Sequence, residues 1–154
     1  MKLPRASAGN LRAGFTIFES LIVISILVIL FTSGLPVGLD FYYSSQFESE
    51  YNTLTSMFQL ARNLAMANYN QSSFGISINS ENFVIFQGAS FAARTVSQDR
   101  SFPRAQSVTI TGSNELVFTQ LSGATASSTF NLSDGRLSRD LYVNSEGLVY
   151  EPSY

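Results

Sequence analysis

The stretch Arg12-Ala13-Gly14-Phe15-Thr16-Ile17-Phe18-Glu19 is followed at once by an apolar run from Leu21 to Phe31. The region from Ser20 to Leu39 is long enough to cross a bilayer, because about 20 predominantly apolar residues suffice. Glu19 stands at the edge of this region, where a carboxylate in hydrocarbon costs roughly 3 kcal/mol or more. We therefore expect a membrane segment in which the Glu19 carboxylate has a partner and a functional role.

Three basic residues without acidic neighbours precede this segment, namely Lys2, Arg5 and Arg12. By the positive-inside rule they predict a cytoplasmic N-terminus, with the chain after Leu39 on the other side of the membrane. A secretory signal peptide also has a basic start, but it would not normally carry Glu19, and no convincing A-x-A cleavage site follows. A plain single-pass anchor is the stronger alternative, although it leaves Glu19 unexplained.

The junction at Gly14-Phe15 resembles the class III leader of type IV pilins and pseudopilins. The resemblance implies cleavage by prepilin peptidase between Gly14 and Phe15, followed by N-methylation of Phe15. Glu19 then becomes the fifth mature residue, where the family carries its Glu, and the resemblance assigns it a role in assembly, paired with an N-terminal ammonium. Pro36 falls at the position of the family's kinking proline. We therefore divide the chain into a leader (1–14), a transmembrane and filament-core helix (15–39) and an extracytoplasmic domain (40–154).

The composition leaves few candidates for catalysis. The 154 residues include neither Cys nor His, which removes disulfides, thiol nucleophiles, Ser-His pairs and the usual zinc ligands. Asp134 and Asp140 form the nearest carboxylate pair, but Arg136 and Arg139 accompany them, and the four are best interpreted as surface charge balance. We expect no catalytic, cofactor or metal site. A membrane-tethered enzyme or ligand-binding domain is the rival interpretation.

Apolar residues recur every three or four positions after the membrane segment, and this spacing predicts an amphipathic helix over 40–70. Its face comprises Phe47, Tyr51, Leu54, Phe58, Ala61 and Ala65, widened by Met57, Leu60 and Leu64. So broad a stripe is suited to packing on a sheet. Gly34, Pro36 and Gly38 precede this helix and predict a bend or a melted turn, the alternative being a linker that ends the membrane helix.

Beyond Asn70 the period becomes that of strands, and turn residues separate the apolar pairs. The pairs are Phe74/Ile76/Ile78, Phe83/Ile85, Val108/Ile110, Leu116/Phe118, Phe130/Leu132 and Leu141/Val143. Hairpin spacing predicts a mostly antiparallel sheet over 73–151, and the fold class is therefore α+β, pilin-like. The segment Gly88–Ala105 is interpreted as a long surface loop. Its Arg94, Arg100 and Arg104 could form an anion-binding patch, although scattered loop arginines are more often solvated surface.

Two further blocks resemble GspH/FimT-like minor pseudopilins. One runs from Phe58 through Ala65 into the strand at Phe74–Ile78, and the other covers 141–149. Arg62, near the helix end, either caps helix carbonyls or contacts another subunit. Gly147 is expected to be a turn glycine with positive φ.

The resemblance implies a structural protein rather than an enzyme: a minor pseudopilin of a type II secretion system. Its partners would be prepilin peptidase, other pilin or pseudopilin subunits and an inner-membrane assembly platform. It would sit in the bacterial inner membrane with a periplasmic domain before entering the filament. The alternative is a minor type IV pilin acting in pilus assembly or DNA uptake. The mature side chains carry a net charge of about −5 and the tail holds Glu151 without a base, so we expect no nucleic acid binding.

Overall fold

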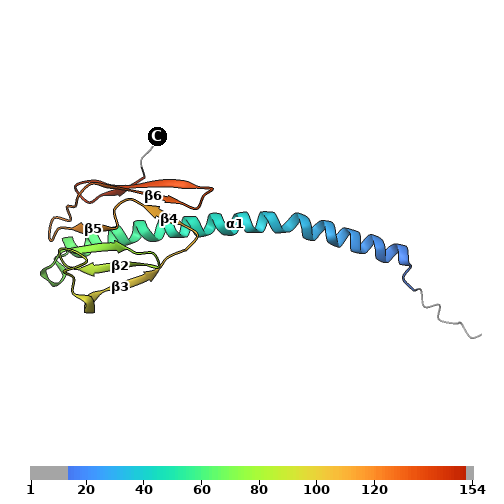
Figure 1. Ribbon diagram of the computed structural model, residues 1–154, viewed down its shortest axis with the longest axis horizontal. Helices are drawn as coiled ribbons and strands as arrows, with labels where there is room; N and C mark the ends of the chain where they lie inside the picture. The colour runs from blue at the N-terminus through green and yellow to red at the C-terminus, as the bar shows by residue number, and fades with distance from the viewer. Residues whose placement is uncertain (1–13, 152–154) are drawn as a thin grey trace, which may run out of the picture. The chain divides into compact units, whose positions relative to one another are not determined.

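A computed structural model describes residues 14–151, apart from the side chains of residues 33–39. The described chain divides into two compact units, of which the first ends at Phe41 and the second begins at Tyr42. One continuous helix, α1 (Ile17–Met66), belongs to both units (Figure 1). The basic leader residues and the last three residues of the chain lie outside the described range. Residues 42–151 are called the domain below.

The predicted apolar face of α1 is confirmed in the domain. All of its six residues are buried: Phe47, Tyr51, Leu54, Phe58, Ala61 and Ala65. Among the residues expected to widen the stripe, Met57 is buried and Leu64 half-buried, whereas Leu60 is exposed. The face therefore supplies the centre of the core, and its rim at Leu60 reaches solvent.

The helix ends earlier than the predicted residue 70. It stops at Met66, and Asn68 adopts a left-handed conformation with φ 54°. A short 3₁₀ helix, η1 (Tyr69–Gln71), follows before the first strand. Asn is among the residues that enter this conformation most readily, which explains why the helix ends here without Gly or Pro.

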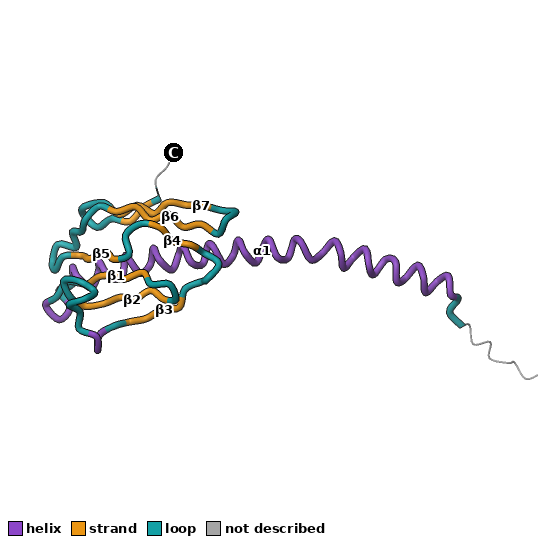
Figure 2. Tube along the Cα trace, in the orientation of Figure 1, coloured by secondary structure: helices purple, strands orange, loops and turns teal. Residues whose placement is uncertain are grey.

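The domain is α+β with antiparallel strand pairing, as predicted, but it has two four-stranded sheets and not one (Figure 2). The first has the order β3-β2-β1-β5 and the second β4-β6-β7-β8. Their bounds are β1 (Phe74–Ile78), β2 (Asn82–Gln87), β3 (Arg100–Pro103), β4 (Thr109–Thr111), β5 (Glu115–Phe118), β6 (Ser128–Ser133), β7 (Ser138–Val143) and β8 (Val149–Tyr150). The predicted alternating pairs lie in these strands, apart from Val108, which is buried just before β4.

The part of α1 within the domain lies between the two sheets and contributes to one core with both (Figure 1). Phe58 on the helix and Phe130 on β6 illustrate the packing, since their ring centroids are 4.9 Å apart. Neighbours in sequence, β4 and β5, belong to different sheets. Alternating hydrophobicity identifies such strands without saying which strand each one pairs with.

The segment Gly88–Ala105 is not simply a loop, because it contains a 3₁₀ helix, η2 (Val96–Gln98), and the edge strand β3. Its first part covers the outer face of the first sheet. Phe86 lies over Gly75 so closely that a Cβ at Gly75 would clash with the ring, and Phe91 stacks edge-on against Phe86 with centroids 5.5 Å apart. The aromatic rings of this segment therefore extend the apolar packing to the second side of β1.

Candidate functional site: the apolar segment and the charged groups of the domain

The apolar segment, residues 15–32, exposes its large hydrophobic side chains. From Ile17 to Phe31 they are between 45% and 84% exposed. In the part of the chain that the structure describes, no helix combines the length and the hydropathy needed to span a membrane. Soluble proteins rarely leave so many contiguous apolar side chains uncovered, which makes this segment a candidate functional site.

Glu19 lies in the first turn of α1, where its carboxylate is close to the positive end of the helix dipole. The Thr16 hydroxyl oxygen accepts a hydrogen bond from the Glu19 backbone N–H at 3.2 Å. Thr16 therefore caps the helix, and Thr16-Ile17-Phe18-Glu19 has the spacing of a capping box. This capping role was not predicted, although the Thr-x-x-Glu pattern in the sequence indicates it.

The hydroxyls within the apolar segment are satisfied by their own helix. Ser25 donates to the Leu21 carbonyl at 2.8 Å, and Thr32 donates to the Val28 carbonyl at 2.9 Å. Such bonds let polar side chains lie in an apolar environment at little cost. Glu19 is the one charged residue between Gly14 and Leu39, and it is exposed.

The predicted cleavage site is accessible. Gly14 precedes the helix, a Cβ there would meet nothing within 4 Å, and Phe15 is exposed. The predicted kink at Pro36 is untested, because its side chain lies outside the described residues. The helix assignment nevertheless continues through this position, so the chain forms neither a linker nor a melted turn there.

Glu50 and Arg104 form a buried ion pair that joins α1 to the chain beyond β3. Glu50 is only 6% exposed, and its Oε1 lies 3.6 Å from Arg104 Nε. Its other oxygen accepts the Ala105 N–H at 3.2 Å. Burial raises the pKa of Glu50, although that hydrogen bond and Arg104 act in the opposite direction. The guanidinium also donates to the carbonyls of Asn79 at 2.6 Å and Val108 at 3.0 Å.

The three arginines proposed as an anion patch have different environments. Arg94 stacks on Phe91, 3.8 Å from the ring centroid, and pairs with Asp99 at 2.8 Å. Arg104 is held by Glu50, and Arg100 is exposed on the edge strand. The interpretation as a common anion site is therefore wrong, because two of these charges serve the domain's own packing.

One of the two alternatives for Arg62, that it caps the carbonyls of its own helix, is not what the structure shows. Its Nε–H donates to the Glu146 carbonyl at 3.2 Å, which attaches the β7–β8 turn to the end of α1. Gly147 has φ 75°, as expected for a turn glycine, and a Cβ there would clash with the Gly123 carbonyl. The helix cap comes instead from the Leu121 N–H, which donates to the Ala65 carbonyl at 2.9 Å.

The acids and bases near the β6–β7 turn balance one another in part as predicted, because the backbone N–H groups of Leu137 and Arg136, and then the Arg136 charge, lower the pKa of the Asp134 carboxyl. Arg139 pairs with Glu48 on α1 at 2.8 Å and lies 3.8 Å from Glu151. Asp140 accepts a hydrogen bond from Asn131 at 2.7 Å. These contacts join α1, β7 and Glu151, so they are explained by the architecture of the domain.

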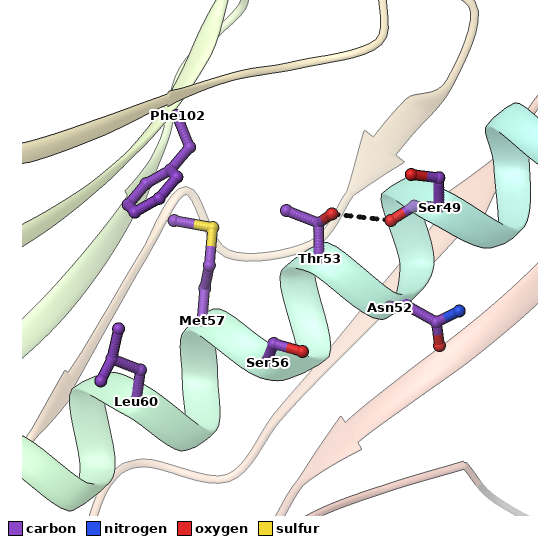
Figure 3. A pocket seen from close by; sticks show the side chains of 7 residues that line it. All are labelled: Ser49, Asn52, Thr53, Ser56, Met57, Leu60 and Phe102. Carbon is purple, nitrogen blue, oxygen red and sulfur yellow. Dashed lines mark hydrogen bonds between the residues drawn. The ribbon is translucent and has the colours of Figure 1, made fainter.

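A surface groove of about 460 Å³ runs between α1 and β3 and is shown in Figure 3. Its lining consists of Ser49, Asn52, Thr53, Ser56, Met57, Leu60 and Phe102. The Thr53 hydroxyl donates to the Ser49 carbonyl at 2.7 Å and so turns back on the helix. Among the described residues, no group of three or more His, Cys, Asp or Glu could hold a metal ion. No titratable side chain lines this groove.

Comparisons with known proteins add no assignment. No family model, no curated protein and no solved structure matches the chain.

Proposed function

We propose that this chain is a structural subunit of a helical filament, a minor pseudopilin of a type II secretion system. The observation that carries the proposal is the exposed apolar segment with a single carboxylate, on the helix that also forms the centre of the domain core. A catalytic or ligand-binding protein has no need of this combination. The resemblance of the Gly14-Phe15 junction to a prepilin leader supports the same conclusion.

In this proposal the precursor is held in the bacterial inner membrane by residues 15–39, with the domain in the periplasm. Prepilin peptidase cleaves between Gly14 and Phe15, and Phe15 is then N-methylated. An inner-membrane assembly platform extracts the subunit into the filament. The apolar segment exchanges lipid for neighbouring helices, so its side chains remain covered by apolar groups at both stages.

Glu19 is proposed to pair with the Phe15 ammonium of a neighbouring subunit or of its own chain. An opposite charge offsets part of the cost of burying a carboxylate among apolar helices, and an unpaired one would oppose entry. The capping bond from the Glu19 N–H involves the backbone and leaves the carboxylate available for this pairing. Substitution of Glu19 should therefore impair assembly and spare the fold of the domain.

The test combines mass spectrometry with an incorporation assay. The membrane-purified protein should begin with N-methylated Phe15, and a mature N-terminus beyond Leu39 would identify a signal peptide and refute the proposal. Glu19→Ala should abolish incorporation into filaments at unchanged melting temperature of the domain. Ser20→Ala, at the adjacent exposed position, is the matched control and should incorporate normally. Normal incorporation of Glu19→Ala would refute the pairing.

The alternative role in DNA uptake has little support in the domain. Arg94 and Arg104 are paired with Asp99 and Glu50, so neither contributes a free positive charge. Because DNA affinity depends on neutralised phosphates, we expect no submicromolar binding by the domain near 150 mM salt, a typical physiological level. A gel-shift titration of duplex DNA tests this.

A further inference from the structure

Two exposed tyrosines lie where α1 enters the domain. Tyr42 is 59% and Tyr43 is 42% exposed, and their rings meet edge to face with centroids 5.8 Å apart. Both lie just after the apolar stretch of residues 15–39 on the same helix. Tyrosine combines an apolar ring with a hydroxyl, and it is enriched where hydrocarbon meets water.

The β6–β7 turn presents an apolar side chain from a rigid tip. The Asp134 carboxylate accepts the N–H groups of Arg136 at 2.8 Å and Leu137 at 2.6 Å, and these bonds lower its pKa. Gly135 supplies the positive φ of 84° that the turn requires. Leu137 is 40% exposed at this tip. The turn therefore holds a hydrophobic residue outward instead of folding it into the core.

The tip lies beside the tyrosines. The Arg136 guanidinium carbon is 6.0 Å from the centre of the Tyr43 ring, at the limit of a cation–π contact. Figure 2 shows the β6–β7 turn at the end of the domain where α1 enters. Tyr42, Tyr43 and Leu137 are called the interfacial patch below. They come from two elements far apart in sequence and gather at one end of the domain.

We propose that the interfacial patch rests in the headgroup layer of a phospholipid bilayer while the subunit awaits assembly. This inference rests on the proposed function, since it requires the apolar segment to be in the membrane. The rise of an α-helix places Ile17 and Leu39 about 33 Å apart, close to the hydrocarbon thickness of about 30 Å. Tyr42 and Tyr43 follow Leu39 by three and four residues in the sequence, so a segment that ends near Leu39 leaves them next to the headgroups.

The lipid surface suits this patch better than a polar partner would. Two of its residues, Tyr42 and Tyr43, directly follow in the sequence the segment proposed to lie in lipid, and the chemistry of the patch is aromatic and aliphatic. Asp134 stands close to Arg136 in the turn, so the patch does not depend on anionic lipid. The occupant is therefore the headgroup and upper acyl region of a zwitterionic bilayer.

The absence of Trp from the chain provides the test. Leu137→Trp introduces the only tryptophan of the chain, at the tip of the turn. Leu121→Trp is the matched control, because Leu121 is also exposed, at 64%, but lies far from the patch. Its N–H donates to the Ala65 carbonyl, and Ala65 is about 33 Å along the helix from Tyr43. Val28→Trp reports on the apolar segment. Each full-length variant is placed in phosphatidylcholine vesicles with lipids brominated at a shallow acyl position.

We expect bromolipid to quench the Leu137→Trp fluorescence at least twofold more than that of Leu121→Trp, and the difference to shrink when Tyr42 and Tyr43 are both replaced by Ser. Equal, weak quenching of the two variants, with strong quenching of Val28→Trp, would overturn the inference and leave the membrane anchor standing. Loss of quenching at Val28→Trp would instead overturn the anchor and the inference with it. A blue shift at residue 137 without quenching would indicate a protein partner and also overturn the inference.

Discussion

The apolar segment and the domain use the same kinds of side chain and treat them in opposite ways. Ile24 and Leu30 on the segment are more than half exposed, whereas Ile76 and Leu54 in the domain are fully buried. The domain covers its helix with two sheets, and the segment has no such cover among the described residues. The comparison shows that one helix can bury its apolar side chains in one half and leave them exposed in the other.

A core truncation should give the largest contrast between the two regions. Phe58→Ala removes a fully buried ring that contacts Phe130, and such a cavity costs about 3–5 kcal/mol in the free energy of unfolding. Ile24→Ala removes an exposed side chain and should leave this free energy unchanged. Chemical denaturation of the full chain in detergent measures both, and equal losses would break the comparison.

Glycine substitutions sharpen the same contrast. Gly147→Ala should cost about 2 kcal/mol or more, because the new Cβ would clash with the Gly123 carbonyl at a position of positive φ. Gly135→Ala also has positive φ but meets nothing within 4 Å, so it isolates the backbone strain, at about 1 kcal/mol. Gly14→Ala, in open space, should not change the unfolding midpoint. A cost at Gly14 equal to that at Gly147 would show that the first region has packing of its own.

The buried carboxylate of the domain should make the stability of the domain depend on pH. Burial raises the pKa of Glu50 from its ordinary 4.5 in the folded domain, so the folded state binds its proton more tightly than the unfolded state. This contribution to stability is complete below pH 4.5 and is lost as the pH rises through the folded pKa. Glu50→Gln should flatten this part of the pH profile of unfolding. An identical slope in wild type and Glu50→Gln would contradict the assignment.

Separating the regions should have the smallest effect. A chain that begins at Phe41 keeps the two sheets and the buried face of α1, so its unfolding free energy should lie within about 0.5 kcal/mol of the full-length value. Circular dichroism should show mixed helix and strand and one cooperative melt. A broad, non-cooperative melt would mean that the domain needs the preceding helix for its stability.

The elements whose signals are local could be predicted from the sequence. The helix face from Phe47 to Ala65 and the alternating pairs of β1 and β2 satisfy simple periodicities, and the structure confirms both. The edge strand β3 was not predicted, because Phe102 is its only large apolar residue and Pro103 is unfavourable in a strand. The division into two sheets depends on pairings between distant strands, which no local pattern encodes.

The charged groups show the same limit. Glu19 could be singled out because an acid next to an apolar run is anomalous wherever it lies in the fold. The partners of Arg104 and Arg62 lie far away in sequence, at Glu50 and Glu146. Their roles therefore depended on knowing the fold, and a surface role was assigned to Arg104 when the side chain is in fact part of the interior.

The attachment of the β7–β8 turn to the end of α1 determines when the domain can fold during synthesis. Arg62 meets Glu146, 84 positions further on, and the helix face between Phe47 and Ala65 is enclosed only when β6 and β7 are in place. Contacts this distant cannot form until synthesis has passed Glu146. The emerging polypeptide therefore remains without its enclosed core until then, and in that interval it is still slender enough to be threaded through a narrow channel.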